Sequence, residues 1–274
     1  MLISETNLKL WMDRFFGYGS WDSPVWLVGY EEGGGDLPEE VADKTNFFAF
    51  HHHTAIQPTL CDVRALYRAV KYRGEGPKGK NFDTLYDYRF GDEAFLHGAW
   101  KNLIALVHGY NNELLPDLLN YQKNHFLSSA DAAMVRLYPL PSPHSHAWYY
   151  RWLVVSEELS YIRYRERYEE RVYPDRMNAI LTQLKRHSPK LVVMYGMNNV
   201  QRIKESFERE FAGLKFKMVK AIKLQVPQHH AAYFEGTQIV ITTQVPTLRH
   251  NRVETGFDWL HFGNLIRSYR PVVV

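Results

Sequence analysis

The chain has 274 residues, of which 45% are hydrophobic and 23% charged, a composition typical of a globular protein with a substantial core. Lys and Arg number 33 and Asp and Glu number 30, so the net charge of +3 excludes a strongly basic nucleic-acid packing protein. The one cysteine, Cys61, excludes a disulfide framework, a four-cysteine zinc site and a cysteine-bound iron–sulfur cluster within one chain.

No targeting or membrane segment is evident in the sequence. The first residues, Met1 to Glu5, lack the basic stretch and apolar stretch of a signal peptide. No uninterrupted apolar run approaches the roughly 20 residues that a membrane-spanning helix needs. We therefore expect a soluble cytoplasmic protein that has no membrane partner.

The first half of the chain contains two predicted strands separated by helical patterns. Val25–Val28 ends at Gly29, and its continuous apolarity predicts a strand buried on both faces. A second such strand is predicted over Ala132–Leu137, which ends at Tyr138-Pro139. Between them, two apolar stripes have helical spacing: Leu60, Val63, Leu66, Tyr67 and Val70, then Leu96, Ala99, Leu103, Leu106 and Val107.

The second half repeats this alternation. Pro174 suits the first turn of a helix, Leu191–Tyr195 predicts a third buried strand, and Gln238–Thr243 predicts a fourth. The segment Lys215–Leu224 favours an edge strand with Lys on one side. Two further helical stripes are Trp148, Trp152, Val155, Leu159 and Ile162, and Val200, Ile203, Phe207 and Phe211. Strands that alternate with helices favour one α/β domain over residues 1–274, with a mainly parallel sheet.

Chemically active residues gather where two of these strands end. In open α/β sheets, ligands bind beyond the carboxyl ends of the strands. Glu31 and Glu32 precede the consecutive glycines Gly33–Gly35 after the first strand, and Arg249–Arg252 follows the last strand. The glycine segment is not a P-loop, because no Gly-Lys-Ser/Thr follows it. Arginines at a strand end suit contacts to phosphate.

The strand ends, taken in order, resemble the uracil-DNA glycosylase superfamily. Gly29-Tyr30-Glu31-Glu32-Gly33 is similar to its first motif, and Val245-Pro246-Thr247 falls where the family has His-Pro-Ser. Arg136–Pro141 and Pro189–Gly196 resemble the ends of its second and third strands, so the pattern spans Trp21 to Tyr269. The resemblance implies a three-layer α/β/α sandwich around a central, mainly parallel four-stranded sheet. It also implies activity without a cofactor or metal.

The resemblance implies that the chain removes a DNA base by hydrolysing its N-glycosidic bond. Glu31 falls at the place of the water-activating acid, and Glu32 is the fallback. Val245 replaces the motif histidine and has no hydrogen to donate to the departing base. The donor role is open to a backbone amide or to one of Gln244, Thr247 and His250.

Aromatic and basic residues complete the predicted site. Phe47 and Phe48 follow the first motif, where family members often carry the aromatic residue that stacks on the base. Tyr30 and Tyr138 stand at strand ends, and we expect Glu31, Tyr138 and Thr247 to border one pocket. Weak, salt-sensitive contacts to DNA phosphates are expected from Arg249, Arg252, Lys78 and Lys80.

Each of these features also has a purely structural interpretation. The two glutamates can cap a helix or pair with an arginine, the phenylalanines can belong to the core, and Arg249–Arg252 can be a solvated turn. His51–His53 is not expected to bind a metal, because adjacent side chains point in different directions. The alternative function is a catalytically inactive nucleic-acid or nucleotide-binding module on the same fold. A third possibility is an unrelated hydrolase on a flavodoxin-like sheet that uses Glu31.

Overall fold

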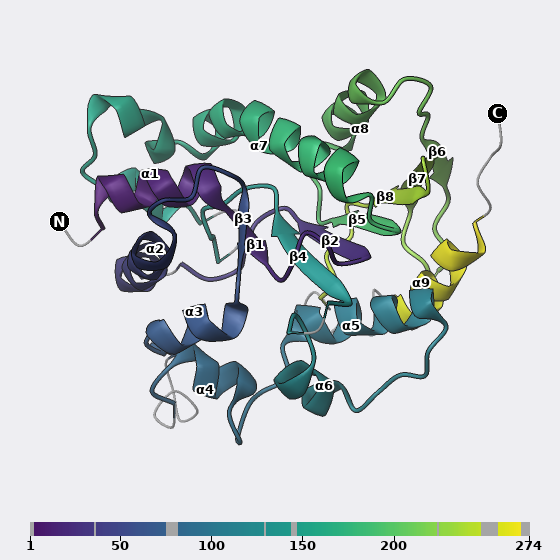
Figure 1. Ribbon diagram of the computed structural model, residues 1–274, viewed down its shortest axis with the longest axis horizontal. Coiled ribbons are helices and arrows are strands. Elements are labelled where there is room, and N and C mark those ends of the chain that lie inside the picture. Colours follow the sequence, from purple (N-terminus) through teal and green to yellow (C-terminus); the bar gives the residue numbers. More distant parts are fainter. Residues whose placement is uncertain are drawn as a thin grey trace.

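A computed structural model describes residues 3–35, 37–74, 82–128, 130–143, 147–223, 225–247 and 257–269. The four buried strands that the sequence predicts are present as β2 (Val25–Gly29), β4 (Ala132–Arg136), β5 (Leu191–Tyr195) and β8 (Thr237–Ile241). They lie side by side in the order β4-β2-β5-β8, and each neighbouring pair is parallel (Figure 1). Every residue of these strands is buried, which explains their continuous apolarity.

The sheet is wider than the sequence predicts: among the described residues it is mixed and has eight strands, so the prediction of a four-stranded sheet is wrong in extent. Beyond β4 lie β1 (Phe15–Tyr18) and β3 (Thr59–Cys61), and beyond β8 lie β7 (His229–Phe234) and β6 (Lys217–Val219). β1 pairs antiparallel with β4, and β7 with β8. These outer strands are short or carry polar residues, so no apolar run marks them. The predicted edge strand is confirmed as β6.

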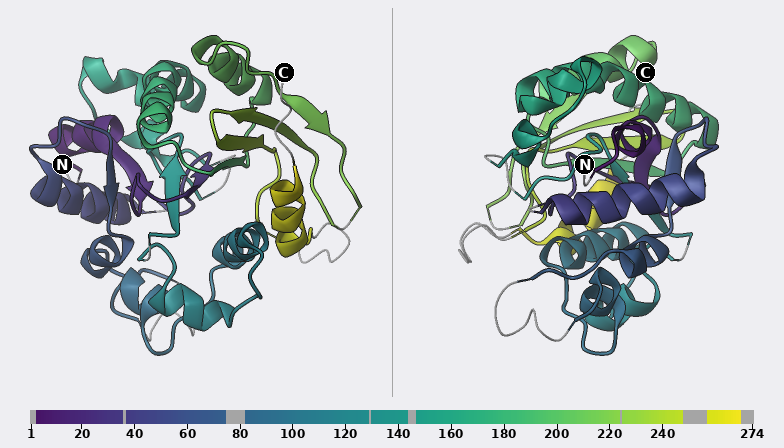
Figure 2. Two further views of the ribbon diagram at one scale, coloured as in Figure 1. Left: turned by 45° about the vertical axis from the view of Figure 1, so that its right-hand side comes forward. Right: turned by 90° about the vertical axis from the view of Figure 1, so that its left-hand side faces the viewer.

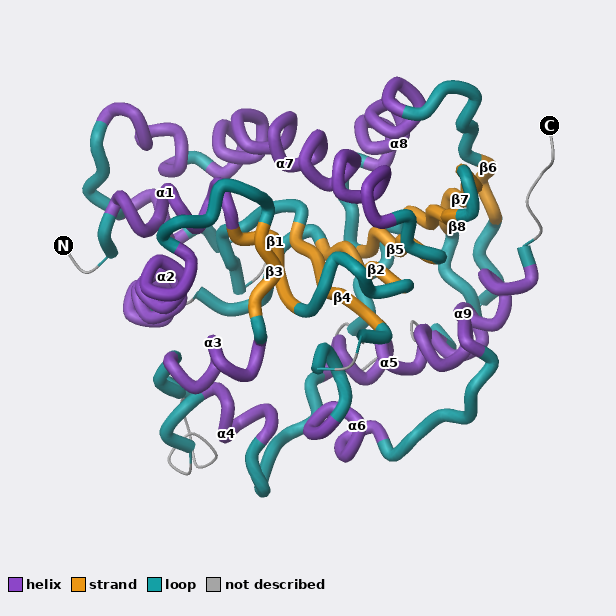
Figure 3. Tube along the Cα trace, viewed as in Figure 1, coloured by secondary structure: helices purple, strands orange, loops and turns teal. Residues whose placement is uncertain are grey.

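Helices cover both faces of the sheet, so the chain is an α/β/α sandwich (Figures 2 and 3). α7 (Arg165–His187) and α8 (Val200–Glu210) lie over one face, and α5 (Gly98–Asn111) and α9 (Trp259–Ser268) lie over the other. The other α-helices in the described part of the chain are α1 (Glu5–Arg14), α2 (Pro38–His52), α3 (Val63–Ala69), α4 (Leu85–Phe90) and α6 (Leu118–Asn124). α1 and α2 lie beside the end of the sheet formed by β1 and β3.

Three local predictions are wrong. Leu60 belongs to β3 and not to the helix that follows it. The stripe from Trp148 to Ile162 forms two short 3₁₀ helices, η2 (Tyr149–Trp152) and η3 (Glu157–Arg163), instead of one α-helix. Pro174 lies well inside α7, because the charged segment before it is also helical. Pro174 is exposed, so water can satisfy the carbonyl that its missing N–H leaves free.

A histidine caps the N-terminus of α5. His97 Nδ1 accepts hydrogen bonds from the backbone N–H groups of Ala99 and Trp100 at 3.1 and 3.3 Å, and its ring stacks on Trp100. Burial, together with the charges of Arg89 and Arg136, lowers the pKa of His97 to about 3. The cap needs the neutral imidazole, because a protonated ring has no acceptor.

We expect acid to weaken the fold through His97. Its folded-state pKa is depressed, so its stabilisation is present above the unfolded value of about 6.5 and is lost as the pH falls toward 3. Between pH 7 and pH 5 the free energy of unfolding should fall by up to about 2 kcal/mol from this group. His97→Asn keeps an acceptor that does not titrate. Urea denaturation at pH 7 and pH 5 should therefore show a smaller loss of the free energy of unfolding in the variant than in the unmodified protein. Equal losses would contradict the role of His97 as a cap.

Candidate functional site

The loops that follow the parallel strands are joined at one edge of the sheet. The Tyr138 N–H donates to the Tyr30 carbonyl at 2.8 Å, which ties the end of β4 to the end of β2. The Gly196 N–H donates to the Gln244 carbonyl at 3.0 Å, which ties the end of β5 to that of β8. Only β5 separates β2 from β8, so their ends lie about 10 Å apart at the usual strand spacing.

Glu31 is held by an arginine from the first turn of α7. Its two carboxylate oxygens accept hydrogen bonds from Arg165 Nη2 at 2.6 and 2.5 Å. Arg165 also donates to Glu169 Oε1 at 2.8 Å and to Ser142 Oγ at 3.3 Å. Burial raises the pKa of Glu31 more than the hydrogen bonds from Arg165 lower it. Arg165 therefore orients this carboxylate and balances its charge.

Glu32 points into the protein instead. The Tyr18 hydroxyl donates to its carboxylate at 3.0 Å, and so does the Tyr67 hydroxyl. Lys44 Nζ lies 3.5 Å from Glu32 Oε1 and 2.8 Å from Glu40 Oε1. Burial alone lowers the pKa of Lys44, but the two carboxylates raise it overall. Glu32 is thus fully engaged in a buried polar cluster, and the fallback catalytic role does not suit it.

A second buried cation, Arg136, ends β4 at the same level of the sheet. Its Nη1 donates to the Tyr195 hydroxyl at 2.8 Å and its Nη2 contacts the sulfur of Met134, while Nε has no hydrogen-bond partner among the described residues. A Cβ atom at Gly29 would lie 2.4 Å from Nη1, so glycine leaves the room that this guanidinium needs. Sequence reasoning missed Arg136, although a charge within the run Ala132–Leu137 was a signal for it.

Tyrosines, rather than phenylalanines, are the aromatic residues beside Glu31. The rings of Tyr30 and Tyr138 pack with centroids 4.7 Å apart. Burial raises the pKa of both hydroxyls, so they remain neutral. Phe48 is fully buried in the core, so it offers no surface to a base, as the structural interpretation predicts. Phe47 is partly buried and packs against His51.

The loop after β8 carries two side-chain amides. Gln244 Nε2 donates to the Val245 carbonyl at 3.0 Å, and Asn102 Nδ2 reaches from α5 to the Pro246 carbonyl at 2.7 Å. Thr247 is partly buried. Sequence reasoning missed Asn102 and Arg165, because each comes from a helix far away in the chain. The predicted residues that lie outside the described part of the chain are Lys78, Lys80, Arg249, His250 and Arg252.

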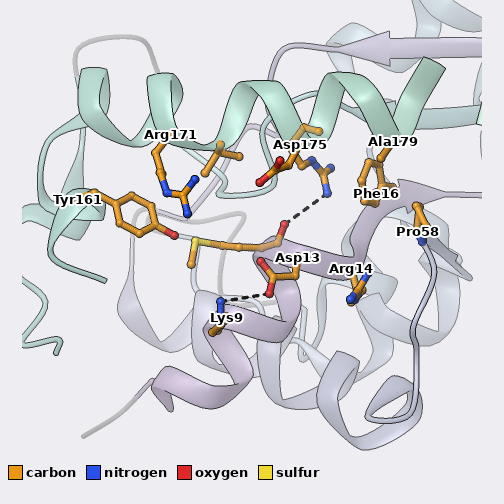
Figure 4. Close-up of a pocket in the computed structure, with 12 residues that line it drawn as sticks. Lys9, Asp13, Arg14, Phe16, Pro58, Tyr161, Arg171, Asp175 and Ala179 are labelled. Carbon is orange, nitrogen blue, oxygen red and sulfur yellow. Dashed lines mark hydrogen bonds and ion pairs between the residues drawn. The ribbon is translucent and has the colours of Figure 1, made fainter. Parts of the chain in front are cut away.

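Two surface cavities lie elsewhere on the molecule. One, of about 400 Å³, lies between α1, η3 and α7, where Arg14, Arg171 and Asp175 surround an apolar floor that includes Phe16 (Figure 4). The other, of about 350 Å³, is lined in part by Cys61. Burial raises the pKa of that thiol to about 12, so it is no nucleophile. Glu31, Tyr138 and Thr247 line neither cavity, and their shared pocket stays a prediction.

Neither metal ligands, nor membrane-spanning helices, nor similarity to known proteins assigns a function to the described part of the chain. Among the described residues, no three His, Cys, Asp or Glu side chains lie together as metal ligands. No helix in the described ranges is long and apolar enough to cross a membrane. No protein-family model, curated protein or solved structure matches this chain. A function must therefore be inferred from the site itself.

The buried pair of Glu32 and Lys44 should couple strongly in folding. Lys44→Met leaves the carboxylates of Glu32 and Glu40 without their cation and should lower the free energy of unfolding by about 3–5 kcal/mol. Glu32→Gln should cost less, because Lys44 keeps its ion pair with Glu40 at 2.8 Å. The double variant should lose clearly less than the sum of the two. The matched control is Lys9→Met, which breaks an exposed ion pair with Asp13 and should cost at most about 1 kcal/mol. Urea denaturation measures the free energy of unfolding of the two single variants, the double variant and the control. Additive losses of this free energy at Glu32 and Lys44 would contradict the coupling between the two residues.

Proposed function

We propose that the chain removes a base from nucleic acid by hydrolysing its N-glycosidic bond, with Glu31 as the catalytic carboxylate. The observation that carries this proposal is the position of Glu31. It stands at the carboxyl end of a central parallel strand, beside the Tyr30–Tyr138 pair, and Arg165 holds it in one orientation. The similarity of Gly29–Gly33 to the first motif of uracil-DNA glycosylases also supports it.

The chemistry needs a negative charge and a positioned water. Breaking the bond from sugar to base leaves an oxocarbenium-like sugar and an anionic base. A carboxylate can stabilise that cation and orient the attacking water. Each oxygen of Glu31 accepts one hydrogen bond from Arg165 and retains a second lone pair that can accept one from water. Arg165 is then a positioning residue that keeps the carboxylate in place.

Base recognition falls to the neighbouring tyrosines and amides. The partly buried Tyr30 can offer aromatic surface to a base, whereas Tyr138 is only 5% exposed and supports the Tyr30 ring from inside the protein. The Gln244 amide, on the loop after β8, is the side-chain donor nearest in sequence to the position where Val245 replaces the motif histidine. Because valine donates nothing to the departing base, excision of uracil is expected to be slow.

The second candidate function is binding without catalysis, and one specific contact favours it. Arg165 contacts both oxygens of Glu31. Its positive charge offsets the negative charge with which Glu31 would stabilise the sugar cation. Together with Val245, this contact describes a site that recognises a nucleotide and leaves it intact. Excision assays separate the two candidates.

We expect Glu31→Gln to abolish excision and Val245→His to increase it. An amide cannot supply the negative charge, whereas a histidine restores a donor whose absence typically costs on the order of a hundred- to a thousand-fold in rate. The measurement is a single-turnover assay on an oligonucleotide that contains uracil. The rate should rise with pH as Glu31 ionises, and the midpoint should lie above the usual range for glutamate because burial raises the pKa of Glu31.

The matched control for this assay is Glu170→Gln, which removes an exposed carboxylate from α7 and should leave the rate unchanged. Full activity in the Glu31→Gln protein refutes the catalytic assignment. No excision by the unmodified protein, combined with measurable oligonucleotide binding, establishes the binding candidate instead.

A further inference from the structure

An exposed aromatic surface lies next to the Glu31–Arg165 pair. Trp152 is 77% exposed, Tyr164 54% and Tyr149 45%. Arg151, Arg163 and Arg167 alternate with them along the chain. We call these six residues the aromatic–arginine surface. Large exposed aromatic side chains that gather in one place commonly mark a binding site.

Hydrogen bonds hold this surface against the candidate site. Trp148 Nε1 donates to the Ile162 carbonyl at 2.7 Å, so the start of η2 lies beside the end of η3. The Tyr150 hydroxyl donates to the Pro141 carbonyl at 3.0 Å, on the loop that follows β4. The Arg165 guanidinium carbon lies 5.4 Å from the centre of the Trp148 ring. The buried residues of this segment thus contact the site, while their neighbours in the chain face solvent.

The arginines of the surface are available to a ligand. Arg151 lies over the Trp152 ring at 5.4 Å, and Arg167 lies over the Tyr164 ring at 4.9 Å. Within the described ranges, none of the three arginines forms an ion pair. Arg151 and Arg167 are exposed, whereas Arg163 is partly buried and its Nε is covered by protein, so Arg163 is the least accessible of the three. Cations beside exposed rings suit a ligand with both flat faces and negative charges.

We propose that the aromatic–arginine surface binds single-stranded nucleic acid and leads the strand to Glu31. This inference rests on the proposed function, because it supplies the substrate class of the same site. Unpaired bases stack on exposed aromatic rings without regard to sequence, and arginines contact the phosphates between them. In a duplex the bases are already stacked on one another, so the surface selects single strands.

The charges nearby set the character of this binding. Glu157, Glu158 and Glu166 lie on the same segment, so its net charge is small and stacking provides most of the affinity. Three arginine–phosphate contacts on a single strand correspond to a slope of about −2 in a plot of log affinity against log salt concentration. A steeper slope would indicate phosphate contacts beyond these three arginines.

Fluorescence anisotropy with a labelled thymine oligonucleotide of about 12 nucleotides, a length within the usual site sizes for single strands, tests the proposal. The double change Trp152→Ala, Tyr164→Ala should weaken binding on the order of ten- to a hundred-fold, without lowering the melting temperature. Phe50→Ala is the matched control, since Phe50 is a 79% exposed aromatic residue on α2 and should leave affinity unchanged. The unmodified protein should bind a duplex of the same length more weakly.

Three outcomes overturn the proposal. They are equal affinity in the double variant, tighter binding of the duplex, and binding of anionic phospholipid vesicles in place of the oligonucleotide. Failure of the proposed function can be told apart from failure of the binding surface. The Glu31→Gln protein should bind the oligonucleotide as the unmodified protein does, because Glu31 is not part of the surface. If binding depends on Trp152 but no base is excised, the surface stands and the catalytic proposal fails. If excision proceeds with an unchanged KM in the double variant, the surface fails alone.

Discussion

The buried carboxylate of Glu32 is the constraint on which the candidate site depends. It lies inside the protein, where Lys44 and two tyrosine hydroxyls compensate its charge. An unpaired charge at this depth would cost several kcal/mol, so the loop after β2 is restricted to conformations that keep these contacts. The chain bends at Tyr30 and Glu31, directly after the end of β2. With Glu32 directed inward, Glu31 is directed toward α7 and meets Arg165.

Residues from three helices converge on this short loop. Lys44 comes from α2 and Tyr67 from α3, while Arg165 comes from the other side of the sheet. α7 is itself docked by Arg176, whose guanidinium donates to the backbone carbonyls of Phe15, Arg136 and Leu137. Those carbonyls belong to the start of β1 and the end of β4, so α7 is tied to the strand ends that form the site.

Arg176 and Arg136 show how the chain uses buried cations. Burial without a carboxylate partner lowers the pKa of Arg176 to about 9, and backbone carbonyls satisfy its donors. Arg136 instead lies beside Tyr195 and within the electrostatic influence of Glu32, which together outweigh the effect of burial and raise its pKa. Arg176 fixes α7 to the sheet, and Arg136 lies at the level of the candidate site.

Part of this architecture can be predicted from the sequence, and the limit has a physical cause. The four central strands are buried on both faces, so continuous apolar runs mark them. The outer strands contain Gly17, the histidines of β7 and Lys217 of β6, so tertiary pairing determines them instead. For the site, strand-end position identifies Glu31 and Tyr138. No local pattern identifies Arg165, whose partner lies 134 residues away in the chain.

The same limit applies to the two glutamates. Glu31 and Glu32 are adjacent and chemically identical, and only their surroundings separate them. One meets an arginine near solvent, and the other meets buried tyrosines and a lysine. The two 3₁₀ helices η2 and η3 were also hidden, because the apolar stripe from Trp148 to Ile162 mimics the spacing of an α-helix, although Trp152 within it is 77% exposed.

The most direct test of the account is a crystal structure of the Glu31→Gln protein with a single-stranded oligonucleotide that contains uracil. The account predicts a base against Tyr30, with its sugar next to residue 31, and neighbouring bases stacked on Trp152 and Tyr164. A strand bound elsewhere, without contact to residue 31, would contradict the central claim that ligands meet this chain at the carboxyl ends of β2 and β4.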